Sequence, residues 1–145
     1  MQSTVGRGQG RVFTLNPQEV HASTIAVTGT LLIDKLKARV LFDSGATYSF
    51  ISPYFAKTLA RDKVLMKSPL AIGIPAGRTI EVKYVFPACV VEIDSKVYLA
   101  DLIELGVLDF DVVLGMDWLS ENYASIDYHD KCVRFKSKES IDFVF

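Results

Sequence analysis

An apolar strand in this sequence runs directly into an aspartate. Residues 40–47 read Val-Leu-Phe-Asp-Ser-Gly-Ala-Thr, so that Asp43 follows three hydrophobic residues and precedes a turn of small residues. An ionised carboxylate is costly to bury unless a partner stabilises it. The pattern therefore indicates an acid placed for chemistry, with Gly45 permitting a close approach of the backbone and Ser44 offering a hydroxyl for hydrogen bonding.

The chemistry open to such an acid is the activation of water. Hydrolysis of an amide without a metal or a covalent nucleophile needs one carboxylate to accept a proton from water. A second, protonated carboxyl must donate to the carbonyl oxygen, and two carboxyls in contact share one proton because both cannot readily ionise. The Asp-Ser-Gly triad occurs once in 145 residues, so two chains would each have to supply Asp43, as a symmetric dimer does.

The alternative interpretation of Asp43 is an ordinary turn acid after a strand. Asp, Ser and Gly are all common in turns, so the triad alone carries little weight. The context favours the chemical interpretation: an apolar run precedes Asp43, a hairpin follows downstream, and the sequence Val-Val-Leu-Gly occurs at 112–115.

The elements that must position Asp43 are predicted to be short strands. β-branched residues indicate a strand over 24–33, and alternating residues indicate a half-buried strand over 36–42, joined by a turn at Asp34 and Lys35. Further strands are predicted over 69–74, 79–86, 88–93, 96–102, 124–127 and 132–135, with an apolar segment over 111–115 and turns at 75–77, 94–95 and 129–130. Short helices are predicted over 53–61, after Ser52 and Pro53, and over 116–122. Many short strands with evenly spaced turns predict an all-β fold, closed or sandwiched.

Composition narrows the class of protein. Half of the residues are hydrophobic and 23% are charged, which is typical of one globular domain. The net charge of −1 and the lack of a sustained basic run argue against a surface for nucleic acid or anionic membrane. No apolar run reaches membrane-spanning length, and we expect no signal peptide. Cys89 and Cys132 lack a Cys-x-x-Cys arrangement, so we expect buried free thiols rather than a disulfide or a metal site.

The two ends of the chain differ from its middle. Residues 1–23 are polar and glycine-rich without periodicity, and we interpret them as a flexible leader or linker. Residues 24–136 are predicted to form the domain itself. Residues 137–145 are interpreted as a loosely attached C-terminal tail.

Three stretches of the sequence resemble the retropepsin family of aspartic proteases, and in particular the protease region of gypsy-type LTR retrotransposon polyproteins. The stretches are residues 27–31 (Val-Thr-Gly-Thr-Leu), 41–51 (Leu-Phe-Asp-Ser-Gly-Ala-Thr-Tyr-Ser-Phe-Ile) and 110–119 (Phe-Asp-Val-Val-Leu-Gly-Met-Asp-Trp-Leu). The resemblance covers roughly residues 24–136. It implies a single-lobe acid protease fold, a closed β-barrel-like structure with one or two short helices, which is active as a homodimer. Aspartic proteases are the best-known case of two carboxyls sharing a proton.

The resemblance also assigns roles to individual residues. Asp43 would be the catalytic aspartate, and Ser44 and Gly45 would build the active-site loop, with the Ser44 hydroxyl bracing the dimer. Ala46 and Thr47 would line the substrate cleft. The flap that closes over the peptide would carry the remaining substrate-binding residues Ile74, Pro75, Ala76 and Gly77. Residues 113–115 would pack behind the active-site loop.

The function expected on these grounds is an aspartic endopeptidase that cleaves a retrotransposon polyprotein. Its partners would be a second copy of the chain and an extended peptide, without metal, cofactor, membrane or strong nucleic-acid binding, and its location intracellular, in the cytoplasm or within virus-like particles. Two alternatives remain open: a catalytically silent dimerisation or peptide-binding module, and a cellular relative of retropepsins. Asp117 and Trp118 are expected to be structural, and His21 and His129 lack a serine or cysteine partner in any recognisable motif.

Overall fold

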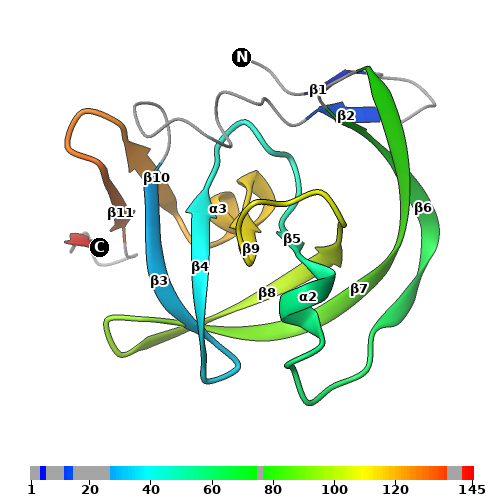
Figure 1. Ribbon diagram of the computed structural model, residues 1–145. Coiled ribbons are helices and arrows are strands. Elements are labelled where there is room, and N and C mark those ends of the chain that lie inside the picture. The colour runs from blue at the N-terminus through cyan, green and yellow to red at the C-terminus, as the bar shows by residue number, and fades with distance from the viewer. Residues whose placement is uncertain (1–3, 6–11, 15–26, 75–76, 137–141) are drawn as a thin grey trace.

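The computed structural model describes residues 4–5, 12–14, 27–74, 77–136 and 142–145. These residues form mainly β-strands with two short helices (Figure 1). The strands are β1 (Thr4–Val5), β2 (Val12–Thr14), β3 (Val27–Ile33), β4 (Leu36–Phe42), β5 (Phe50–Ile51), β6 (Val64–Ile74), β7 (Arg78–Ile93), β8 (Lys96–Glu104), β9 (Val112–Leu114), β10 (Ala124–Asp127), β11 (Cys132–Lys136) and β12 (Asp142–Val144). The helices are α2 (Pro53–Ala56) and α3 (Met116–Glu121).

Six strands close into a barrel. Going round it, β3 pairs with β4, β4 with β9, β9 with β5, β5 with β8 and β8 with β7, and β7 returns to β3. A closed barrel leaves no free sheet edge along the paired segments. This arrangement confirms the predicted all-β, closed fold with one or two short helices.

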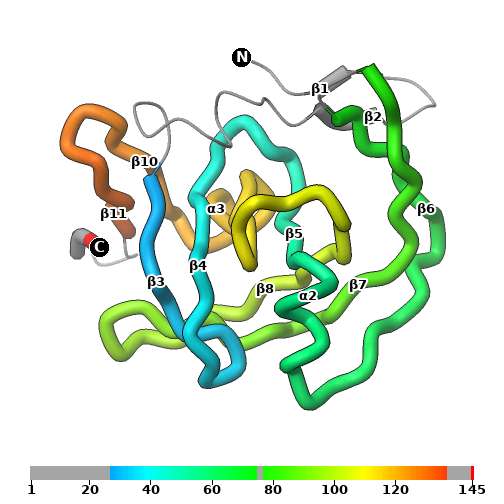
Figure 2. The backbone as a smooth tube through the Cα atoms, in the orientation of Figure 1, coloured from blue at the N-terminus to red at the C-terminus, as the bar shows by residue number. Residues whose placement is uncertain are grey.

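A long ribbon extends from the barrel. The first part of β7 pairs antiparallel with β6, from Ile74 opposite Arg78 to Val64 opposite Val85, and β2 adds to β6 in parallel. Figure 2 shows this ribbon curving up one side of the barrel. Gly77, in the turn that joins the two strands, has a φ of +77°, which glycine adopts without strain.

The tight turns follow the sequence closely. Asp34 and Lys35 have φ values of 50° and 71°, and Asp94 and Ser95 have values of 49° and 68°. Two consecutive residues at positive φ define the turn whose twist matches a β-hairpin. The β3–β4 and β7–β8 hairpins are therefore confirmed at the predicted positions.

Strand β4 is buried on both faces near its end. Val40 and Phe42 point into a core shared with Trp118 of α3, whereas Leu41 points into a second core with Phe50 and Val113. Because side chains alternate along a strand, three consecutive buried residues need a core on each side. This double burial fixes the strand immediately before Asp43.

Three sequence predictions about element boundaries are wrong. The strand predicted over 69–74 begins five residues earlier, at Val64. The strands predicted over 79–86 and 88–93 form one continuous β7, whose pairing with β8 shifts register between Phe86 and Cys89. Pro87 has no N–H to donate, and Ala88 takes a φ of 52°, so the chain passes through a bulge and continues. The helix predicted over 53–61 ends at Ala56, although Ser52 caps it as expected by accepting from the Phe55 N–H at 3.1 Å.

Parts of both terminal segments lie within the described residues. Within the predicted leader, Thr4–Val5 and Val12–Thr14 are paired strands, and the rest lies outside the described residues. Within the segment predicted to be a C-terminal tail, β12 pairs with β11 and the Phe145 ring lies against that of Phe42, with ring centroids 5.8 Å apart.

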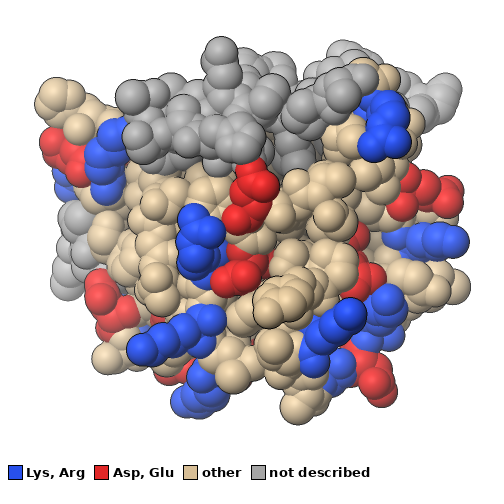
Figure 3. All heavy atoms as spheres, in the orientation of Figure 1, with Lys and Arg blue, Asp and Glu red and all other residues tan. Residues whose placement is uncertain are grey.

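The surface and the cysteines agree with the composition. On the face shown in Figure 3, acidic and basic side chains are interspersed around the barrel. Among the described residues, no helix has the length and hydropathy needed to cross a membrane. Cys89 and Cys132 are both buried, as predicted. The Cys89 thiol lies 3.4 Å from the Phe86 carbonyl oxygen, and burial raises its pKa to about 11.

We predict that Phe42→Ala lowers the free energy of unfolding by about 3–5 kcal/mol, the usual cost of truncating a buried phenylalanine. Phe42 is fully buried and its ring contacts those of Trp118 and Phe145. Urea unfolding at one fixed protein concentration measures the change, since association would alter apparent stability. Tyr54→Ala is the control, because Tyr54 is 83% exposed. A loss below about 1 kcal/mol for Phe42→Ala would contradict the packing described.

Candidate active site

Asp43 lies at the point where β4 leaves the barrel. Its N–H donates to the Leu114 carbonyl at 3.0 Å, which continues the parallel pairing of β4 with β9. Its side chain is only 3% exposed, and its Oδ1 accepts a hydrogen bond from the Gly45 N–H at 2.8 Å. The strand thus delivers a carboxylate into a buried position where a backbone amide stabilises its charge.

The loop after Asp43 is held by backbone hydrogen bonds to α3. The Asp43 carbonyl accepts from the Ala46 N–H at 3.2 Å, which closes a tight turn. The Met116 N–H donates to the Ala46 carbonyl at 2.8 Å, and the Asp117 N–H donates to the Thr47 carbonyl at 3.1 Å. The first turn of α3 therefore uses its free amides to fix the active-site loop.

Gly115 is required where the loop crosses the start of α3. A Cβ built on Gly115 would lie 2.3 Å from the Tyr48 carbonyl oxygen and 2.6 Å from that of Ala46. Both contacts are with backbone and are shorter than real Cβ contacts ever are. The predicted packing of residues 113–115 behind the active-site loop is therefore confirmed, and it depends on the missing side chain.

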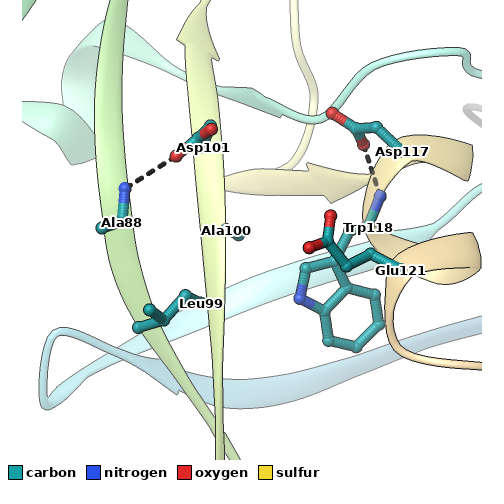
Figure 4. A pocket seen from close by; sticks show the side chains of 7 residues that line it. All are labelled: Ala88, Leu99, Ala100, Asp101, Asp117, Trp118 and Glu121. Carbon is teal, nitrogen blue, oxygen red and sulfur yellow. Dashed lines mark hydrogen bonds between the residues drawn. The ribbon is translucent and has the colours of Figure 1, made fainter.

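A polar pair of the buried Ser49 and the partly solvated Asp117 reinforces the same contact. The Ser49 hydroxyl donates to Asp117 Oδ1 at 2.6 Å and accepts from the Gly115 N–H at 3.0 Å. Asp117 Oδ1 also accepts from the Trp118 N–H at 2.7 Å (Figure 4). Asp117 thus has a structural role, as the sequence analysis predicted. Ser49 was missed by the sequence analysis, and its only signal was a hydroxyl between hydrophobic neighbours.

The pKa of Asp117 reflects the partial desolvation of its carboxyl, although the residue as a whole is exposed. Burial raises its pKa above the ordinary value of 3.8, while the hydrogen bonds from Ser49 and Trp118 act in the opposite direction. Asp101 also raises it by repulsion. Figure 4 shows Asp117, Asp101 and Glu121 around a pocket of about 250 Å³ between β8 and α3. Asp43 is not among the residues that line this pocket.

The residues after Asp43 differ in exposure. Ser44 is exposed and shares a short hydrogen bond with the Tyr128 hydroxyl, from the turn between β10 and β11. Ala46, predicted to line the cleft, is 3% exposed and belongs to the core with Leu41 and Val113, whereas Thr47 is partly exposed. Tyr128 was not predicted, since nothing local in the sequence connects it with Ser44, 84 residues away.

The predicted flap residues lie on the β6–β7 ribbon. Ile74 ends β6 and is 8% exposed, whereas Gly77 is exposed in the turn that precedes β7. Pro75 and Ala76 lie outside the described residues. Figures 1 and 2 both place this turn, the loop after β4 and the β10–β11 turn toward the upper side of the molecule.

Solved structures with the same fold include a protease and a retroviral protease-like domain. EIAV protease complexed with the inhibitor HBY-793 matches with a TM-score of 0.56 and 20% identity, over 70% of this chain and 92% of that one. The retroviral protease-like domain of Ddi1 from Leishmania major matches with a TM-score of 0.55 and 12% identity, over 83% of this chain and 93% of that one. These similarities define a single-lobe retropepsin-like fold.

The sequence itself assigns the family. Residues 7–140 match the model of the retroviral aspartyl protease family, and the chain belongs to that family. The predicted retropepsin resemblance is therefore confirmed at the level of family and fold. No curated protein matches the chain.

We predict that Gly115→Ala destabilises the protein by about 1–3 kcal/mol, the cost of forcing extra volume into a packed site. The added methyl meets two backbone carbonyls, which can move only if the active-site loop shifts. The matched control is Gly106→Ala, since a Cβ there meets nothing within 4 Å. Thermal and urea unfolding of both variants check this, and equal stability of the two would contradict the close contact.

We predict that Asp117→Asn removes a pH-dependent loss of stability. Because the folded-state pKa of Asp117 is raised, the folded protein binds more protons than the unfolded chain between pH 3.8 and the raised pKa. The contribution of this group is therefore most favourable below pH 3.8 and is lost as the pH rises through the raised pKa. Asparagine keeps an oxygen that can accept from Ser49 and Trp118.

The measurement is urea unfolding of wild type and Asp117→Asn at a series of pH values from 3.5 to 7. The stability of the variant relative to wild type is expected to increase with pH over this range. A difference that is constant with pH would mean that Asp117 titrates alike in the folded and unfolded states.

Proposed function

We propose that the chain is an aspartic endopeptidase in which Asp43 activates water. The observation that carries the proposal is the buried Asp43 carboxylate, held by the Gly45 amide at the end of a strand in a retropepsin-like barrel. In this mechanism one Asp43 accepts a proton from water as the water oxygen attacks the scissile carbonyl carbon. The other, protonated Asp43 donates to the carbonyl oxygen. As the C–N bond breaks, the first Asp43 passes the proton taken from water to the leaving amine, and a hydroxyl of the tetrahedral intermediate returns a proton to the second Asp43.

The mechanism requires two chains. Each chain contributes one Asp-Ser-Gly triad, so a complete pair of carboxyls forms only across a two-fold axis. Two carboxyls brought together there share one proton, and their apparent pKa values belong to the pair. Activity should therefore depend on protein concentration as well as on pH.

The substrate we propose is an extended peptide lying between the active-site loop and the β6–β7 ribbon. Backbone groups of a strand-like peptide can pair with those of the protein, as in other cases of strand addition. We further propose that the substrate is a retrotransposon polyprotein, cleaved inside the cell in the cytoplasm or in virus-like particles. The support is the resemblance of residues 41–51 and 110–119 to gypsy-type elements.

A second candidate is a cellular retropepsin relative that acts on regulatory substrates. The similarity of fold to the Leishmania major Ddi1 domain favours it. The two candidates are distinguished by the genomic context. A coding sequence for reverse transcriptase directly downstream supports the retrotransposon enzyme, and its absence supports the cellular relative.

We predict that Asp43→Asn abolishes cleavage of a mixed peptide library at mildly acidic pH while the fold remains nearly intact. Loss of a group that reacts directly is expected to lower the rate by roughly a thousandfold or more. The matched control is Asp62→Asn, an exposed acid in the loop between α2 and β6, which should cleave like wild type. Circular dichroism checks that both variants are folded.

The same assay on a dilution series tests the requirement for two chains. Specific activity of wild type should fall steeply once the protein is diluted below its dimer dissociation constant. Cleavage by Asp43→Asn at the wild-type rate would refute the proposed mechanism. A dimer that binds peptides and never hydrolyses them would support the catalytically silent module instead.

A further inference from the structure

The contact between Ser44 and Tyr128 connects the active-site loop with a distant hairpin. The Ser44 hydroxyl shares its hydrogen bond with the phenol oxygen of Tyr128, in the turn between β10 and β11. Ser44 is exposed and Tyr128 is 38% exposed, so both lie at the surface next to the buried Asp43. The turn therefore lies at the surface, beside the exposed part of the active-site loop.

The turn that carries Tyr128 is internally braced. Asp127 Oδ1 accepts from the N–H groups of His129 and Asp130, each at 3.0 Å. Arg134 on β11 bonds to Asp127 Oδ2 and Asp130 Oδ2, each at 3.2 Å. The backbone hydrogen bonds and Arg134 lower the pKa of Asp127, so the brace is ionised at neutral pH. Tyr128 is thus presented at Ser44 by a preorganised turn.

The geometry of a shared carboxyl pair limits where a second chain can lie. The two Asp43 carboxyls must approach to about 3 Å to share a proton, so the two-fold axis passes next to Asp43. The neighbouring exposed residue is Ser44, and the phenol of Tyr128 is in contact with it. A second chain that completes the pair must therefore also approach Tyr128.

The surface around the loop suits contact with an identical copy. Residues near a two-fold axis meet their own counterparts, which disfavours unpaired charges there. Ser44, Gly45 and Tyr128 are uncharged, and so is Met116, whose N–H bonds the loop and whose side chain is 38% exposed. The two acidic side chains of the turn, Asp127 and Asp130, are paired with Arg134. Two partly exposed large side chains beside the loop supply apolar area for burial.

We propose that the β10–β11 turn is a dimer contact, in which Tyr128 packs against the second copy of the chain beside the two-fold axis. The inference rests on the proposed function, because the need to join two Asp43 residues places the axis. The ring of Tyr128 supplies buried area, and its hydroxyl holds the Ser44 side chain of the active-site loop. Chain association and the geometry of the active-site loop are thereby coupled through one side chain.

Sedimentation equilibrium of the full chain tests the proposal with Tyr128→Ala, Tyr128→Phe and the control Tyr54→Ala. Tyr128→Ala should raise the dimer dissociation constant roughly tenfold or more, as expected for a central interface aromatic. Tyr128→Phe keeps the ring and should raise it by a smaller factor. Tyr54 is 83% exposed on α2, toward the other end of the barrel, and its truncation should leave the constant unchanged (Figure 1).

The activity of the same variants separates a dimer contact from a general structural effect. If Tyr128 acts through association, the specific activity of Tyr128→Ala should recover at protein concentrations well above its raised dissociation constant. Circular dichroism checks that the variants are folded. If Tyr128→Ala does not fold, the dimer dissociation constant of Tyr128→Phe decides whether Tyr128 contributes to the dimer contact.

The outcomes distinguish this proposal from the proposed function. Wild type that dimerises through Tyr128 and cleaves no peptide supports the contact and refutes the protease. Wild type that cleaves while both Tyr128 variants dimerise like wild type overturns the contact and leaves the protease standing. A wild-type chain that stays monomeric at all concentrations overturns the contact as well.

Discussion

The close approach of the active-site loop to Gly115 is the constraint on which the rest of the site depends. The carbonyls of Ala46 and Tyr48 lie where a side chain at 115 would begin, so the loop rests directly on the backbone. The Ser49 hydroxyl adds a buried hydrogen bond from the Gly115 N–H and a partly buried one to Asp117 across the same contact. Strand pairing, helix α3 and the loop thus form one rigid support, which is what a group must have if it is to meet a reacting atom accurately.

The parts of the fold that depend on local sequence could be predicted. The hairpin before Asp43 follows from alternating residues and from Asp34, whose residue type is common in tight turns. The position of Asp43 at a strand end could likewise be predicted, because an apolar run must stop where the charge begins. Local hydrophobicity also predicted that Val113 and Leu114 are buried. That pattern did not show what they pack against, and only the resemblance to a known family placed them behind the active-site loop.

Apart from the early end of helix α2, the features that sequence analysis missed depend on contacts between distant residues. Nothing near Pro87 shows that β7 continues beyond it, since only the register with β8 keeps the strand together. Phe145 packs on Phe42 from the far end of the chain. Ser49 has partners 66 and 68 residues away, and the partner of Ser44 is 84 residues away. Side-chain hydroxyls are too common for such pairs to be inferred from one sequence.

The burial of both cysteines has a practical consequence for labelling. A thiol with a pKa near 11, such as that of Cys89, holds little reactive thiolate at neutral pH. Cys132 is likewise shielded, at 8% exposure. A maleimide dye should therefore react almost wholly with a single cysteine introduced at the surface, without removal of the native two. Energy transfer between donor- and acceptor-labelled chains could then follow their encounter and separation in real time.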